Sequence, residues 1–111
     1  VINDQIGSPT YAADLAQVII DIISFNEWKP GIYNYTNEGK ISWYDFAKDI
    51  KFLCGFNDVI LNPVSSNDYF NKADRPKYSI LDKTKIKMTF NVEIIPYFDS
   101  LKRCIKILKN E

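Results

Sequence analysis

Apolar residues recur along much of the chain at the three- and four-residue spacing that places them on one face of a helix. This spacing predicts a first helix from about Tyr11 to Phe25, with apolar positions 12, 15, 16, 19, 20 and 23. It predicts a second helix with apolar positions 43, 46, 47, 50, 53 and 54. Near the end of the chain it predicts a short helix over 83–88 and a last helix with apolar positions 98, 101, 105 and 108. The pattern therefore indicates three substantial helices and one short helix.

Residues that favour helix ends flank the first two segments. Thr10 is expected to cap the first helix, and Asp14 lies near enough to that end to interact favourably with the helix dipole. Ser42 and Asp45 have the spacing of a capping box at the start of the second helix. Gly55 is expected to end that helix in the left-handed conformation.

Similar preferences mark the last two helices. Asp82 is expected to cap the short helix, and Pro96 suits the first turn of the last one.

Short apolar segments rich in β-branched and aromatic residues predict strands. They are the end of a strand at Val1–Ile2, a strand over 32–36, and a strand over 59–64 that a proline would place at a sheet edge. A turn is expected over 37–40. Residues 65–78 form a polar loop longer than a connection needs to be, which makes it a candidate functional loop.

These elements predict a single domain of the α/β class over residues 1–111. The chain begins without Met, at what looks like the end of a strand, so we expect the domain to be excised from a longer protein.

The charge balance argues against polyanionic partners. Fourteen Lys and Arg residues face fourteen Asp and Glu residues, and the formal net charge is zero. Binding to nucleic acid or to a membrane surface needs a net positive field, so neither is expected as a partner. No apolar run approaches the length of a membrane span, and a cytoplasmic location is expected.

The residue types available exclude several chemistries. There is no histidine and there are only two cysteines, so a Ser-His-Asp triad and common zinc sites lack their groups. Cys54 and Cys104 have apolar neighbours, which favours buried free thiols over a disulfide. The four glycines cannot compose a G-x-G-x-x-G turn, so no dinucleotide site is expected within this chain. No metal site is predicted.

Two motifs on the second helix could suggest catalysis. Tyr44 and Lys48 have the spacing of the acid/base pair of short-chain dehydrogenases, but seven tyrosines and many lysines make about one such match expected by chance. We interpret the pair as a surface lysine beside a helix tyrosine. Asp45 and Asp49 are likewise interpreted as a solvated face rather than a carboxylate dyad.

Three segments resemble, in sequence, order and spacing, the C-terminal part of the dTDP-4-dehydrorhamnose reductases. They are D-Q-I-G-S-P-T-Y-A-A-D-L-A at 4–16, G-I-Y-N-Y-T-N-E-G-K-I-S-W-Y-D-F-A at 31–47, and A-D-R-P-K-Y-S-I-L-D at 73–82. The resemblance covers nearly the whole chain. It implies the substrate-binding lobe of an extended short-chain dehydrogenase/reductase, with the N-terminal Rossmann half, which carries the catalytic Tyr-x-x-x-Lys pair, missing.

The resemblance also implies a reaction for the parent enzyme. It is the reduction of dTDP-6-deoxy-L-lyxo-4-hexulose to dTDP-L-rhamnose, a sugar donor for bacterial surface polysaccharide, with NADPH or NADH as cofactor. This chain alone would then be inactive and bind no cofactor. Two alternatives remain: a non-catalytic subunit on the same fold, like the regulatory subunit of methionine adenosyltransferase, and another nucleotide-sugar epimerase or dehydratase.

Five residues are candidates for contact with a dTDP-sugar. Arg75 lies in the long loop, and its planar guanidinium suits a diphosphate, although an ion pair with a nearby aspartate is an equal alternative. Gln5, Gly7, Ser8 and Thr10 precede a predicted helix N-terminus, where backbone N–H groups favour an anion or sugar hydroxyls, and helix capping alone is the alternative. Surface that would meet the Rossmann half should remain exposed, so a homodimer is possible.

Overall fold

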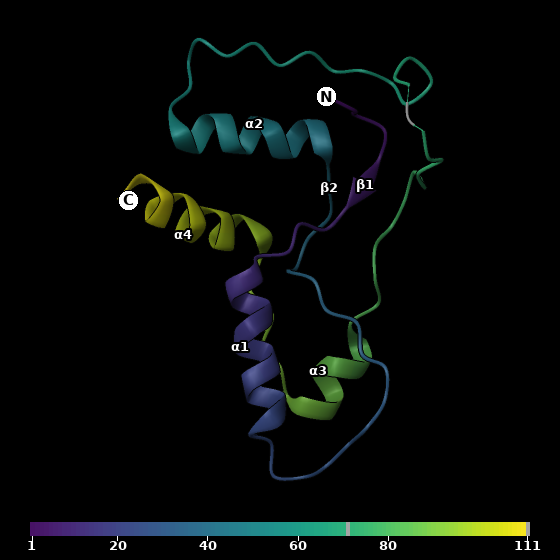
Figure 1. Cartoon of the computed structure of the whole chain (residues 1–111), viewed down its shortest axis with the longest axis vertical. Coiled ribbons are helices and arrows are strands. Elements are labelled where there is room, and N and C mark those ends of the chain that lie inside the picture. Colours follow the sequence, from purple (N-terminus) through teal and green to yellow (C-terminus); the bar gives the residue numbers. More distant parts are fainter. Residues whose placement is uncertain (71, 111) are drawn as a thin grey trace.

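The computed structural model describes residues 1–70 and 72–110, which form four helices and a small two-stranded sheet (Figure 1). Three helices are long and one is short, which confirms the predicted class. The helices are α1 Ala12–Ile23, α2 Trp43–Cys54, α3 Thr84–Phe90 and α4 Tyr97–Lys109. The strands are β1 Ile6–Gly7 and β2 Ile41–Ser42, which pair antiparallel.

The sheet lies elsewhere than predicted. The segments 32–36 and 59–64 are not strands, apart from one bridge between Ile2 and Val64. Within 32–36, Tyr33 and Tyr35 pack against the apolar core, so every second side chain faces inward as it would in a strand. The backbone of this segment nevertheless has no strand partner in the described chain. Alternation alone reports a half-buried segment, while a strand also needs a neighbouring backbone.

Helix boundaries follow local chemistry in α2 but not in α1. The Ser42 side chain accepts a hydrogen bond from the Asp45 N–H at 3.0 Å, and Gly55 ends α2 with φ of 70°, so both predictions are confirmed. The Thr10 prediction is wrong: the N-cap of α1 is Tyr11, without a side-chain cap, and the Tyr11 N–H instead donates to Asn37 Oδ1 at 2.7 Å.

The short helix α3 begins one residue later than expected, and its N-cap is Lys83, without a side-chain cap. Asp82 lies one residue before the cap and still accepts from the Thr84 N–H at 2.9 Å. Pro96 is the N-cap of α4, immediately before its first turn.

The apolar core is small and lies between α1 and α3 (Figure 1). Val18, Ile86 and Phe90 form it, and the rings of Phe25 and Tyr33 pack edge-on against Phe90 at 5.2 and 5.0 Å. Because few side chains are fully buried here, this core alone provides modest stability.

The face of α1 that looked most apolar is not the buried one. Leu15, Ile19, Ile20 and Ile23 are between 37% and 77% exposed, while Asp14 and Val18 are buried. No described segment of the chain packs over this stripe of four residues, which we call the α1 stripe. The periodicity identified an apolar face correctly, but the chain itself does not cover it.

A polar centre lies beside the apolar core. Asn37 is 0% exposed, and Thr36, Lys83 and Ser100 are also buried. The expected turn over 37–40 is wrong: Glu38 forms a bridge with Pro96, and hydrogen-bonding partners from distant segments enclose Asn37.

Both cysteines are free thiols, as predicted, but they are half-buried rather than fully buried. In residues 1–70 and 72–110 no helix has the length and apolar character needed to cross a membrane.

Candidate functional site

The segment around β1 and the long loop 65–78 meet in the fold; residue 71 of that loop lies outside the described residues. The Ile6 N–H donates to the Lys77 carbonyl at 2.8 Å, and the Ser79 N–H donates to the Ile6 carbonyl at 3.0 Å. β1 thus pairs with β2 on one side and with the end of the loop on the other. This pairing brings Gln5 and Arg75, which are far apart in sequence, to the same place.

Two adjacent clefts share Gln5 and Arg75. The first, which we call the Arg75 cleft, has a volume of about 440 Å³, and its lining residues are Ile2, Gln5, Trp43, Arg75, Pro76 and Ser79. Arg75 is the only charged residue in this lining. The second cleft, of about 450 Å³, is lined by Gln5 and by residues 66–70 and 73–75 of the loop, which include Asp68 and Asp74. A guanidinium beside a tryptophan offers bidentate donors for an anion and a flat apolar surface for a ring.

Arg75 itself faces solvent. No ion pair between described residues joins it to Asp74 or Asp82, the partners that a purely structural role would use. Asp82 instead accepts from the start of α3. Arg75 lines both clefts, and none of the ion pairs between described residues includes its guanidinium.

The base of the loop is anchored by Asp4. Its carboxylate accepts from the Ser66 N–H at 3.0 Å and from the Ser66 hydroxyl at 2.8 Å. These hydrogen bonds hold the pKa of Asp4 below its usual value. The loop is thus attached to the chain immediately before Gln5.

The other predicted site residues have different environments. Gly7 lies next to Trp43: a Cβ at this position would be 3.3 Å from Ser79 Oγ, which is a tight contact, and 3.7 Å from the indole, which is an ordinary van der Waals contact. The Ser8 hydroxyl donates to the Gly39 carbonyl at 2.6 Å. Thr10 lines a separate, smaller pocket of about 110 Å³. Gln5 and Arg75 therefore come together with Gly7 nearby, while Ser8 and Thr10 do not reach this cleft.

Trp43 is the lining residue that the sequence analysis did not single out. It is the first residue of α2, and its indole is 41% exposed. In the sequence Trp43 has the spacing of an ordinary apolar position on a helix. Its place directly after the Ser42 cap could have indicated a cleft residue, because a side chain in the first turn projects toward the segment that precedes the helix.

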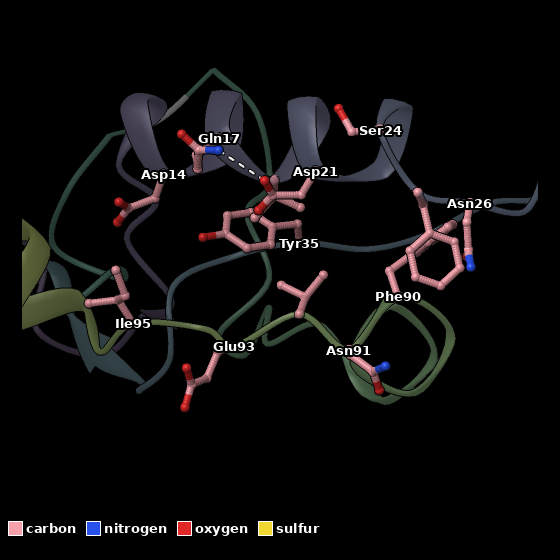
Figure 2. A pocket seen from close by; sticks show the side chains of 13 residues that line it. Asp14, Gln17, Asp21, Ser24, Asn26, Tyr35, Phe90, Asn91, Glu93 and Ile95 are labelled. Atoms are coloured by element: carbon pink, nitrogen blue, oxygen red, sulfur yellow. Dashed lines mark hydrogen bonds between the residues drawn. The ribbon is translucent and has the colours of Figure 1, made fainter.

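The largest cleft, of about 700 Å³, lies between α1 and the segment after α3. Figure 2 shows the carboxylates of Asp14, Asp21 and Glu93 around it, with the Tyr35 ring between them and Gln17 donating to Asp21 at 2.9 Å. No Lys or Arg lines it. Burial raises the pKa of Tyr35, so its hydroxyl stays protonated. This carboxylate-rich cleft is unsuited to an anionic ligand, so of these two clefts the Arg75 cleft is the better candidate for one.

Tyr44 and Lys48 lie on the surface of α2, as interpreted from the sequence. The Lys48 ammonium is 4.8 Å from the centroid of the Tyr44 ring and forms an ion pair with Asp45 at 2.7 Å. Asp49 accepts from the Tyr97 hydroxyl at 2.9 Å, so the two aspartates have separate partners and form no dyad.

The described residues form a helical lobe in which one cleft is lined by an arginine as its only charged residue. Residues 1–110 match the family model described as the RmlD substrate binding domain, and the chain belongs to this family.

Relatives and solved structures agree with that assignment. The chain is 45% identical over 87 residues to the spore coat polysaccharide biosynthesis protein SpsK of Bacillus subtilis, covering 78% of this chain and 29% of that protein. It is 40% identical over 113 residues to a dTDP-4-dehydrorhamnose reductase of Aggregatibacter actinomycetemcomitans, covering 92% of this chain and 38% of that one.

Two crystal structures have the same fold. A dTDP-4-dehydrorhamnose reductase from Clostridium acetobutylicum superposes with a TM-score of 0.89 at 36% identity, over 98% of this chain and 38% of that one. The Bacillus anthracis reductase, solved in complex with NADP, gives 0.80 at 36% identity, over 93% of this chain and 35% of that one. The chain thus spans well under half the length of these proteins.

Proposed function

We propose that this chain is the substrate-binding lobe of an NADPH-dependent dTDP-4-dehydrorhamnose reductase and that it binds the dTDP-sugar in the Arg75 cleft. The observation that carries the proposal is the convergence of Gln5 and Arg75 on a cleft whose only charge is positive. The guanidinium binds the diphosphate with two parallel hydrogen bonds. Trp43 and Pro76 supply apolar surface against which a ring of the ligand packs.

The residues of this chain do not fit NADPH. Its four glycines are widely separated, and none forms the turn that cradles a pyrophosphate. Hydride donation and the acid/base pair therefore belong to a part of the reductase outside this chain. We expect the chain alone to have no reductase activity.

The test uses the intact reductase that contains this lobe. Arg75→Lys should raise KM for the dTDP-sugar about tenfold, because an ammonium cannot reproduce the bidentate contact, whereas kcat and KM for NADPH should change less than about twofold. The matched control is Lys77→Ala, which removes an exposed charge from the same loop without touching either cleft.

Each alternative has its own outcome. An unchanged sugar KM with a lowered Tm would show that Arg75 is structural. An intact protein that binds no dTDP-sugar by calorimetry would contradict the proposed function and favour a non-catalytic subunit on the same fold.

A further inference from the structure

The buried side chain of Asn37 hydrogen-bonds to several segments of the lobe, including the one that leads from the candidate site into α1. The Asn37 Oδ1 atom accepts from the Tyr11 N–H at 2.7 Å. Its Nδ2 atom donates to Asp14 Oδ2 at 2.8 Å, to the Ile95 carbonyl at 3.0 Å and to Ser100 Oγ at 3.0 Å. Both polar atoms of Asn37 are therefore engaged, and together they contact the start of α1, the link before α4, and α4 itself.

Asn37 holds the segment that leads from the candidate site into α1. That segment, residues 5–11, carries Gln5 and Gly7 and lacks a side-chain cap of its own. Residues 37–42 contact it along its length. The Ser8 hydroxyl donates to the Gly39 carbonyl, β1 pairs with β2, and the last contact is the bond from Tyr11 to Asn37.

Asn37 is itself supported on its other side. The buried ammonium of Lys83 donates to Thr36 Oγ1 at 3.2 Å and to the Asn37 carbonyl at 3.4 Å. The Glu38 N–H donates to the Ile95 carbonyl at 3.1 Å, and the Glu38 carbonyl accepts from the Tyr97 N–H at 2.9 Å. Lys83, the N-cap of α3, and the residues at the start of α4 thus hold the backbone of residues 36–38 in place.

We propose that Asn37 is a positioning residue for substrate binding, which holds residues 5–11 so that Gln5 and Gly7 face Trp43 and Arg75. This inference rests on the proposed function. Asn37 lines neither of the two clefts beside Arg75, so it acts through the segment it holds. Without its side chain the Tyr11 N–H loses its partner, and the segment moves relative to Arg75.

The test compares Asn37→Ala with Ser100→Ala in the intact reductase. Ser100 belongs to the same buried network at the α4 end, and its hydroxyl hydrogen-bonds with Asn37 and Asp14 rather than with residues 5–11, so it is a matched control for lost stability. Both variants should lower Tm. At a temperature well below both transitions, only Asn37→Ala should raise KM for the dTDP-sugar, by about tenfold, with kcat changed less than about twofold. Equal sugar KM values in the two variants would overturn the proposal.

Hydrogen exchange provides a readout that does not depend on turnover. Asn37→Ala should speed amide exchange in the peptide 5–11 by at least about tenfold, and Ser100→Ala should leave that peptide close to wild type. Unchanged exchange in 5–11 would overturn the positioning role even if the enzyme is active. Faster exchange in a protein that reduces no dTDP-sugar would support the role of Asn37 in holding the segment and contradict only the proposed function.

Discussion

The two arginines of this chain occupy opposite environments. Arg103 donates to the buried carboxylate of Asp14 and to Ser100, whereas Arg75 faces the candidate cleft. Burial by itself would raise the pKa of Asp14, but hydrogen bonds from Arg103, Ser100 and Asn37 together hold that pKa below its usual value. Asp14 is therefore charged at neutral pH and depends on its partners.

Removing Arg103 should cost stability in a pH-dependent way. Arg103→Met should lower the free energy of unfolding at pH 7 by about 1–3 kcal/mol, because a buried carboxylate loses its cation. A depressed folded-state pKa contributes stability above the unfolded value near 3.8, and that contribution is lost as pH falls through the folded value. The difference from wild type should thus shrink below about pH 4 in thermal unfolding measured from pH 3 to 7.

The control for this prediction is Lys102→Met. Lys102 and Asp99 form an exposed ion pair at 3.1 Å, which should contribute less than about 0.5 kcal/mol. If Arg103→Met lowers the free energy of unfolding by only this small amount at every pH, Arg103 does not stabilise the buried Asp14 carboxylate as proposed.

At the scale of elements, two residues with the same sequence preference behave differently. Ser42 caps α2, while Thr10 is exposed and leaves α1 without a side-chain cap. Thr10 lies one residue before the N-cap Tyr11, and the Tyr11 N–H donates to Asn37, which is remote in sequence.

Alanine substitutions at Ser42 and Thr10 should therefore have different effects on the free energy of unfolding. Ser42→Ala should lower the free energy of unfolding by about 1 kcal/mol, and Thr10→Ala should change it by less than about 0.5 kcal/mol. Chemical denaturation of both variants under identical conditions is the measurement. A larger loss for Thr10→Ala than for Ser42→Ala would contradict the assignment of the caps.

At the scale of the whole molecule, the lobe is open. Its radius of gyration is 16.5 Å, compared with about 13 Å for a compact chain of this length. Its accessible surface is 8046 Å², which is about 1700 Å² more than a compact monomer of this mass exposes. The large apolar side chains that this surface exposes include the α1 stripe.

The isolated chain should therefore self-associate through the α1 stripe. Sedimentation velocity at high micromolar concentration should show dimers or larger species, and the double variant Ile20→Lys, Ile23→Lys should shift them toward monomer. The control Trp28→Lys changes a strongly exposed aromatic residue outside α1 and should leave association unchanged. A strictly monomeric wild-type chain at that concentration would refute this prediction.

Local interactions explain which features could be predicted. The helices, the cap at Ser42 and the left-handed Gly55 depend on residues within a few positions of one another, so the sequence by itself determined them. The candidate site was partly predictable from residue chemistry: Arg75 was expected to contact a diphosphate and Gln5 to lie before a helix N-terminus, and the fold brings both to one cleft.

Contacts between distant residues decided the rest. Asn37 lies in a stretch with turn composition, and only partners from α1 and α4 make it the most buried side chain of a polar centre. Trp43 became a cleft residue because β1 pairs with β2 directly before it. Periodicity shows which side of α1 is apolar, but whether that side is covered depends on what packs there, and that is a property of the tertiary structure alone.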